Sequence, residues 1–200
     1  MSQFIAPQPF DTQPDTRSRT DLRKHLRQQR RALPYEEQQQ AAEQLALNLL
    51  THPDLHRARH IAIYLPNDGE IDPRLYMDLA ERKGVRFYLP VLHPIHTGTL
   101  VFSPFTDTSE LKANRFGIPE PAFSKGLKRP AWALDAVLFP LVGFDENGGR
   151  LGMGGGFYDR TFASRECGRG WLPNLSGWPS IFRECRSYQR SPGTYRCMAW

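Results

Sequence analysis

The chain has 200 residues, of which 40% are hydrophobic and 24% are charged, and its net charge is +5. This length is enough for one domain with a hydrophobic core. No apolar run approaches the roughly 20 residues that a membrane-spanning helix needs, so the composition excludes an integral membrane protein. The first 18 residues are polar and lack the apolar centre of a secretory signal, so we expect a disordered extension on a cytoplasmic protein.

The first half of the chain predicts two helices and a β-α-β unit. Arginines near helical spacing predict a basic helix over Arg19–Leu33, and an apolar stripe predicts a second helix over Pro34–Leu50. The segments His60–Leu65 and Val85–Leu89 predict strands, separated by a helix over Asp72–Lys83. The two strands are expected to be parallel, with a right-handed crossover.

The second half continues the α/β pattern. Thr99–Ser103 predicts a short edge strand, and Leu111–Pro121 contains so many turn residues that we expect a loop. Asp135–Pro140 is nearly all apolar and predicts a strand covered on both faces. A turn over Asp145–Gly149 and a helix over Gly156–Phe162 complete one α/β domain, residues 19–163, with a mostly parallel sheet.

The strongest chemical signal is the segment Arg150–Asp159, RLGMGGGFYD. Its glycines allow positive φ and a close approach of the backbone, and successive amides in such a run can bind phosphate oxygens. A helix start after the glycines adds free N–H groups, Arg150 a positive charge, and Asp159 a carboxylate for magnesium. The segment is neither a Walker A loop nor a dinucleotide motif, and a flexible hairpin is the structural alternative.

Two further sites are candidates. Arg19 and Arg23 lie one helical turn apart and can clamp a phosphate or a carboxylate, or they belong to a solvated basic face. Glu70 follows the strand His60–Leu65 at its carboxyl end, where an acid can accept hydrogen bonds from substrate amino groups. An ordinary turn residue is the alternative for Glu70.

The histidines carry no clear signal. His52, His56 and His60 are spaced by four, but Pro53 interrupts any helix through them and His60 begins a strand, so we assign them no metal. His93 and His96 follow the strand Val85–Leu89 and remain without a role.

Four segments in order resemble the 5-formyltetrahydrofolate cyclo-ligase family, also called 5,10-methenyltetrahydrofolate synthetases: IAIYLPNDGEIDP, VRFYLPVLHP, LKANRFGIPEP and DAVLFPLVGFDENGGRLGMGGGFYDR. The resemblance covers about Thr20 to Phe162. It implies a three-layer α/β fold with helices on both faces, and ATP and Mg²⁺ as cofactors. It further implies a catalytic role for Arg150, Mg²⁺ binding by Asp159 and folate binding by Leu65 and Glu70. The ATP contacts implied are Arg19, Thr20, Asp21, Leu22, Arg23, Arg150, Leu151, Gly152, Met153, Gly154, Gly155, Gly156, Phe157 and Tyr158. The family often has lysine where Arg19 stands.

The reaction that this resemblance implies needs no protein nucleophile. The formyl oxygen on N5 of the folate attacks the γ-phosphate of ATP, and N10 then closes the ring with loss of phosphate. Catalysis would come from positioning two substrates and from neutralising charge on the phosphoryl group. The implied partner is a reduced folate, and we expect a monomer without nucleic-acid or membrane partners.

Two other classes of protein stay open at this point. A non-catalytic module that binds RNA or another polyanion would need basic residues interleaved with aromatics, and Arg19–Arg31 has no aromatic residue. An ATP-independent sugar-phosphate isomerase or acyl-transfer enzyme on a similar sheet would need a catalytic carboxylate or lysine near the glycines.

The segment Ser164–Trp200 differs from the rest of the chain. It holds six arginines, two glutamates, no lysine, all three cysteines and three of the four tryptophans, and so accounts for +4 of the net charge. The cysteines lack C-x-x-C spacing, and their odd number argues against a disulfide framework. We expect an irregular, aberrant tail.

The residues of this tail permit a frameshift interpretation. Ser176–Phe182 can be encoded so that the frame one base earlier reads VGLAFDF, and with permitted codons the rest continues PRVSKLPAEPWDIPLYGV. That string contains the strand and the LPxExWDxPL segment with which the resembled family ends, including an aspartate that also serves magnesium. We therefore hypothesise a frameshift between Asp159 and Pro173, by mutation or by sequencing error, that impairs the chain as written.

Overall fold

The computed structural model describes residues 17–121, 128–145, 150–163 and 195–196. The helices are α1 (Arg19–Arg31), α2 (Tyr35–Thr51), α3 (Arg74–Glu81) and α4 (Phe157–Phe162), with short 3-10 helices η1 (Pro53–Leu55) and η2 (Ala131–Ala133). The strands are β1 (His60–Ala62), β2 (Arg86–Leu92), β3 (Leu100–Phe105), β4 (Leu111–Ala113), β5 (Pro119–Pro121), β6 (Ala136–Val137), β7 (Gly143–Asp145), β8 (Arg150–Leu151) and β9 (Tyr195–Arg196).

The predicted helices are confirmed, with ends that differ by one or two residues. Ser18 caps α1 because its hydroxyl oxygen accepts a hydrogen bond from the Asp21 amide at 3.2 Å. The N-cap of α3 is Pro73 instead of the predicted Asp72, whose carboxylate accepts a hydrogen bond from the Arg74 amide at 2.9 Å. Gly84, at φ +80°, lies just after the end of α3.

The central sheet has the strand order β3-β2-β1-β6. β1 pairs in parallel with both β2 and β6, and β3 pairs antiparallel with β2 at the edge, as the mostly parallel prediction requires. β1 and β6 are shorter than predicted. β6 begins after Asp135, whose carboxylate accepts hydrogen bonds from the amides of Arg59 and His60, both at 2.8 Å.

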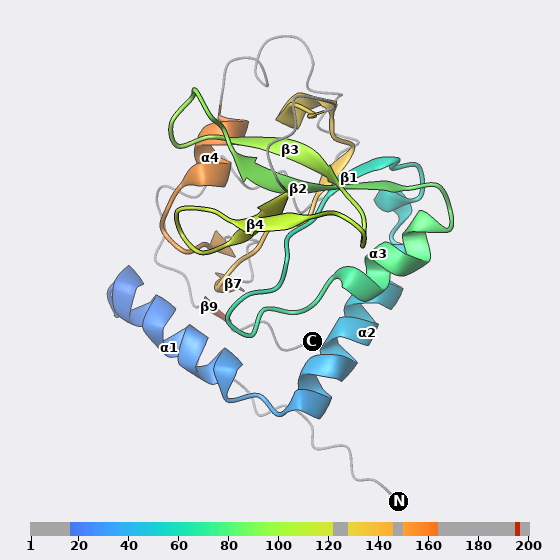
Figure 1. Ribbon diagram of the computed structural model, residues 1–200. Helices are drawn as coiled ribbons and strands as arrows, with labels where there is room; N and C mark the ends of the chain where they lie inside the picture. Colours follow the sequence, from blue (N-terminus) through green and yellow to red (C-terminus); the bar gives the residue numbers. More distant parts are fainter. Residues whose placement is uncertain (1–16, 122–127, 146–149, 164–194, 197–200) are drawn as a thin grey trace, which may run out of the picture.

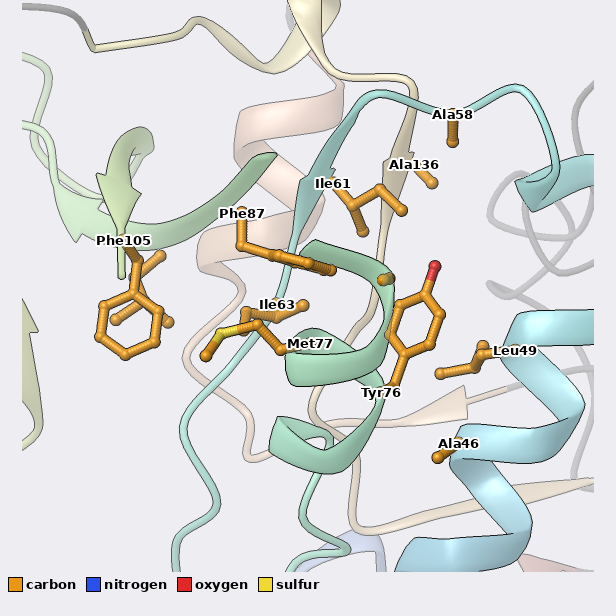
Figure 2. Close-up of a cluster of buried hydrophobic side chains, with 12 residues drawn as sticks. Ala46, Leu49, Ala58, Ile61, Ile63, Tyr76, Met77, Phe87, Phe105 and Ala136 are labelled. Atoms are coloured by element: carbon orange, nitrogen blue, oxygen red, sulfur yellow. The ribbon is translucent and has the colours of Figure 1, made fainter. Parts of the chain in front are cut away.

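Helices cover both faces of this sheet (Figure 1). On one face, α2 and α3 pack against β1 and β2 around a core that includes Ile61, Met77 and Phe87, drawn in Figure 2. On the other face, Tyr158 and Phe162 of α4 pack against a second buried cluster that also holds residues of η2. These three layers confirm the α/β class and the predicted arrangement of helices.

The prediction of a loop over Leu111–Pro121 is wrong, because β4 and β5 form an antiparallel hairpin there. The Asn114 side-chain oxygen accepts hydrogen bonds from the amides of Phe116 and Ile118, at 2.9 and 3.1 Å, and Gly117 adopts φ +73°. The residues interpreted as helix and strand breakers are therefore those that build a tight turn.

Several expectations concern residues outside the described part of the chain. These are the disordered extension before residue 17, most of the turn at 145–149, and the tail except Tyr195 and Arg196. Those two residues form β9, which pairs antiparallel with β7. Within the described residues, no helix is long and apolar enough to cross a membrane.

Candidate functional site

Two segments that follow strands of the domain meet helix α1. One is the loop between β1 and α3, which contains Glu70, and the other is the glycine segment between β8 and α4. In Figure 1, α1 lies along the side of the molecule, where the loop after β1 approaches it. Leu22 and Leu26 of α1 are buried with Val142 and Leu151, so α1 is anchored on the strand that leads into the glycines.

The glycine segment uses the conformational freedom of its residues. Gly154 and Gly156 adopt φ +92° and +63°, where a side chain would be strained. Arg23 donates from Nε to the Gly152 carbonyl oxygen at 2.7 Å, and a Cβ added at Gly154 would lie 3.4 Å from Arg23 Cζ. The predicted pair of segments, α1 and the glycines, is therefore in direct contact.

Arg160 holds the far side of the glycine segment. Its Nη2 donates to the Gly155 carbonyl at 2.6 Å, and its Nε donates to the Gly98 carbonyl, in the turn between β2 and β3, at 2.9 Å. The neighbouring Thr161 hydroxyl accepts from the Leu100 amide at 2.8 Å. These bonds fasten α4 and the glycines to the carboxyl end of β2.

The two charged residues that bracket the glycines are paired with each other. Arg150 Nη2 donates to Asp159 Oδ1 at 2.8 Å, and the guanidinium also lies 3.9 Å from the centre of the Phe139 ring. The Asp159 side chain is 75% exposed, whereas that of Arg150 is 22% exposed. Because the Asp159 carboxylate is open to solvent, water screens the pair, and Asp159 can turn to a cation at little cost.

Glu70 lies in a loop whose carboxylates form ion pairs with arginines of α1. Its Oε2 accepts from the Asn67 amide at 3.2 Å, and its Oε1 lies 3.8 Å from Arg30 Nη1. Burial raises the pKa of Glu70, while the Asn67 amide and the charge of Arg30 act in the opposite direction. Asp68 beside it contacts Arg27, Arg30 and Arg31. Burial acts to raise the pKa of Asp68, but the hydrogen bonds and charges of Arg27 and Arg31 lower it overall.

The charges of Glu70 and of Arg150, which precedes the glycines, both act on the phenol of Tyr158. Burial raises the pKa of the Tyr158 phenol, and the Glu70 carboxylate raises it further, whereas the Arg150 guanidinium lowers it. Tyr64 also lies in this region and donates to the Ile71 carbonyl at 2.9 Å. The charge of Glu70, which is predicted to bind folate, and that of Arg150, which is predicted to bind phosphate, thus act on the same hydroxyl.

The other residues predicted to contact folate or ATP are either packed in the core or exposed on the surface. Leu65 is half-buried against the core under α2 and α3. The buried side chains of Leu22 and Leu151 serve packing, so only their backbone could contact a nucleotide. Arg19, Thr20 and Asp21 are exposed on the first turn of α1, and Met153 is exposed in the glycine segment. The Phe157 ring lies 5.7 Å from that of Phe116, on the β4–β5 hairpin.

Sequence reasoning missed three residues of this region: Arg30, Asp68 and Arg160. Arg30 follows Arg23 at helical spacing, but that pattern equally describes a solvated basic face. The partners of Arg30 and Arg160 lie elsewhere in the chain, which local periodicity does not reveal. Asp68 adopts φ +58°. Aspartate tolerates this conformation, but its presence in a sequence does not predict it.

Comparisons with known proteins agree with this geometry. The sequence model of the 5-formyltetrahydrofolate cyclo-ligase family matches residues 15–172. The chain is 46% identical over 136 residues to the 5-formyltetrahydrofolate cyclo-ligase of Escherichia coli, covering 68% of this chain and 75% of that protein. It is 40% identical over 152 residues to the protein of the same name in Haemophilus influenzae, covering 76% and 79%. The solution structure of Aquifex aeolicus 5,10-methenyltetrahydrofolate synthetase is similar, with a TM-score of 0.61 at 28% identity over 72% of this chain and 71% of that one.

Proposed function

The chain belongs to the 5-formyltetrahydrofolate cyclo-ligase family, and from this membership we propose that it cyclises 5-formyltetrahydrofolate to 5,10-methenyltetrahydrofolate, with conversion of ATP to ADP and phosphate. The structural observation that carries the proposal is that α1 contacts both candidate segments: Arg30 donates to the Asp68 carbonyl in the Glu70 loop, and Arg23 donates to the Gly152 carbonyl in the glycine segment. This arrangement joins an acid suited to amino groups with a backbone suited to phosphates.

The residues divide between the two substrates. Glu70 would accept hydrogen bonds from the amino groups of the pterin ring, and Leu65 would line that pocket. The glycine segment and Arg23 would bind the phosphates of ATP, together with the exposed first turn of α1. Arg150 would leave Asp159 and neutralise the charge that develops on the transferring phosphoryl group.

In this reaction every bond change involves substrate atoms. The oxygen of the N5-formyl group forms a bond to the γ-phosphorus as the bond from that phosphorus to ADP breaks. The N10 nitrogen then attacks the formyl carbon, phosphate leaves and the N10 proton is lost. The protein would contribute by holding the two substrates in register and by excluding water from the phosphoryl group.

Asp159 suits a magnesium ion that arrives with the nucleotide. Magnesium in such sites is held by one or two carboxylates, with phosphates and water as the other ligands, and Asp159 has an exposed carboxylate beside the glycines. Among the described residues there is no cluster of three or more His, Cys, Asp or Glu that could form a dedicated metal site. Bound magnesium would supply charge neutralisation at the phosphates.

The two other classes of protein receive less support. The arginines of α1 contact Asp68 and Gly152 instead of lining a surface interleaved with aromatics, as a polyanion-binding module would need. An ATP-independent isomerase or acyltransferase does not accord with the family to which the chain belongs.

Two measurements test the proposed function. ATP with magnesium should raise the melting temperature, and 5-formyltetrahydrofolate should raise it further, because each ligand binds only the folded protein. Incubation of the protein with both substrates should then form the methenyl product and ADP in equal amounts. Product formation without ATP, or stabilisation by RNA in place of the two substrates, would contradict the proposal.

We extend the proposal to a cytoplasmic monomer that acts on a small-molecule substrate without a nucleic-acid or membrane partner. Light scattering of the purified protein and fractionation of the cells that produce it test these statements.

A further inference from the structure

Arg30 is the one charged side chain that is buried among the described residues, with 3% of its surface exposed. A charge is costly to bury unless hydrogen bonds and an opposite charge satisfy it. Its position on the inner side of α1 is therefore informative, because the helix carries other arginines that remain exposed.

The guanidinium of Arg30 joins two segments that are far apart in sequence. Its Nε donates to the Asp68 carbonyl at 2.9 Å and its Nη2 to the Asp68 carboxylate at 3.2 Å. Its Nη1 donates to the Leu141 carbonyl at 3.1 Å and lies 3.8 Å from Glu70 Oε1. Leu141 lies between β6 and β7, so one side chain ties the Glu70 loop to the segment that leads into β7.

The loop is shaped around this side chain. Asp68 and Gly69 both have positive φ, +58° and +77°, and a Cβ added at Gly69 would lie 3.4 Å from the Arg30 carbonyl oxygen. The left-handed conformation of Asp68 is disfavoured for a residue with a side chain, so surrounding contacts must hold it. Arg27 and Arg31 also contact the Asp68 carboxylate, but their side chains are 35% and 56% exposed.

We propose that Arg30 is a positioning residue for the folate site, which holds the backbone of the Glu70 loop so that the carboxylate meets the donor groups of the pterin ring. This rests on the proposed function. Arg30 itself does not need to touch either substrate. Its effect is exerted through the Asp68 carbonyl, through the Leu141 carbonyl and through its charge near Glu70.

The charge of Arg30 also bears on the ionisation of Glu70. The other groups that face Glu70 are Arg27 on α1, Asp68 in the same loop, and the phenols of Tyr64 and Tyr158. Arg27 and Arg30 are the charged groups among these that favour the carboxylate form, in addition to the hydrogen bond from the Asn67 amide. Removal of Arg30 should therefore raise the pKa of Glu70 further and weaken its ability to accept hydrogen bonds at mildly acidic pH.

The test compares Arg30→Gln with Arg31→Gln, a matched control because Arg31 contacts the same Asp68 from the exposed side of the helix. For Arg30→Gln, the KM for 5-formyltetrahydrofolate should rise at least about tenfold, which is about 1.4 kcal/mol. The KM for ATP should change less than about twofold, and the acid limb of the folate kcat/KM profile should move to higher pH. Arg30→Lys should restore part of the loss, and Arg31→Gln should resemble the wild type.

A second measurement separates positioning from general stability. If Arg30 acts through Glu70, adding Arg30→Gln to Glu70→Gln should raise the folate KM far less than it does in the wild type. Additive effects, an equal rise of both KM values, or an unmoved acid limb would overturn the proposal. If Arg30→Gln does not fold, Arg30→Lys carries the same comparison.

Hydrogen exchange distinguishes a failure of this inference from a failure of the proposed function. Amides of residues 67–70 should exchange faster in the Arg30 variant than in the Arg31 variant, whatever the substrate is. Unchanged exchange would refute the positioning role, whereas faster exchange in a protein that does not turn over folate would refute only the proposed function.

Discussion

The guanidinium of Arg150 contacts two groups at once, the Asp159 carboxylate and the face of the Phe139 ring. The ring contact keeps the side chain beside the glycines, while the exposed carboxylate can be exchanged for a phosphate. In the structure, Arg150 and Asp159 neutralise each other, although their proposed roles differ.

We expect Arg150→Ala and Asp159→Ala each to lower kcat/KM by about 10²–10³, because each removes charge stabilisation at the phosphoryl group. Both variants should remain folded. Asp159→Ala should change the melting temperature little, since an ion pair with an exposed partner contributes only about 0–1 kcal/mol. Arg150→Ala should lower it somewhat more, because it also removes the contact with the Phe139 ring. Arg82→Ala, which removes an exposed arginine just after α3, is the control for lost charge. Normal turnover in either variant would remove the assignment of the phosphate site.

His60 lies at the opposite end of β1 and is held in its neutral form. Arg129 Nη2 donates to His60 Nε2 at 3.0 Å, which assigns the proton to Nδ1, 2.9 Å from the Tyr88 hydroxyl. Burial and the charge of Arg129 lower the pKa of His60 from 6.5, although Asp135 acts in the opposite direction. Below pH 6.5 the unfolded chain therefore binds the proton more readily than the folded protein does.

The free energy of unfolding should consequently fall as the pH decreases from about 7.5 to about 5, because protonation favours the unfolded state. Glu70 acts in the opposite sense at the acid end of this range, since its pKa is raised, and His93 acts in the same sense as His60. Urea unfolding of the wild type and of His60→Gln at each pH isolates the contribution of His60. If the free energy of unfolding depends on pH equally in the two proteins, His60 does not contribute to that dependence.

At the scale of elements, the position of α4 is fixed by hydrogen bonds to the connection between β2 and β3. Arg160 connects the Gly98 and Gly155 carbonyls, and it approaches both Gly98 and Gly156 so closely that a Cβ there would clash with its guanidinium. The glycine segment is thus held by Arg23 on one side and Arg160 on the other. This arrangement predicts that Arg160 supports ATP binding without contacting the folate.

Arg160→Met should raise the KM for ATP by about 3–10-fold per lost hydrogen bond, each being worth about 0.5–1.5 kcal/mol. The KM for 5-formyltetrahydrofolate should stay within about twofold of the wild type, and Arg82→Met should change neither value. A rise confined to the folate KM would mean that α4 positions the pterin side of the site instead.

The sequence predicted the elements with the longest patterns best. α1 has arginines at helical spacing, α2 has an apolar stripe, and α3 follows the pair Asp72 and Pro73, and these are local features. The loop predicted at Leu111–Pro121 is a hairpin, because Asn and Gly mark tight turns as well as irregular chain. Likewise, the glycine segment could be located from its composition, whereas Arg30 could not be assigned, because its partners lie 38 and 111 residues away.

At the scale of the whole molecule, the central sheet raises a question about the chain after Phe162. β6 is the outermost strand on its side of the sheet in the part of the chain that the structure describes, and β1 is its partner there. Ala136 and Val137 of β6 are nevertheless buried. The short segment VGLAFDF of the alternative frame alternates large apolar residues with small or polar ones, which is the period-two pattern of a strand.

The family match ends at residue 172, which agrees with our proposal of a frameshift between Asp159 and Pro173. The chain as written would then lack a strand whose Val, Leu and Phe side chains each stabilise the fold by about 1.5–3 kcal/mol when buried. It would also lack the second aspartate expected to serve magnesium. The residues after the shift would come from a frame that was never selected for folding.

Resequencing the gene tests the frameshift directly, and expression of both reading frames tests its consequence. The protein with the restored frame should unfold at a higher urea concentration and with a larger m-value than the chain as written, because it exposes more surface on unfolding. Its cyclisation rate should also be higher, since the restored segment would supply the second aspartate proposed to serve magnesium beside Asp159. An uninterrupted frame through this region, together with equal stability and activity of the two proteins, would show that Ser164–Trp200 is the native end of a working enzyme.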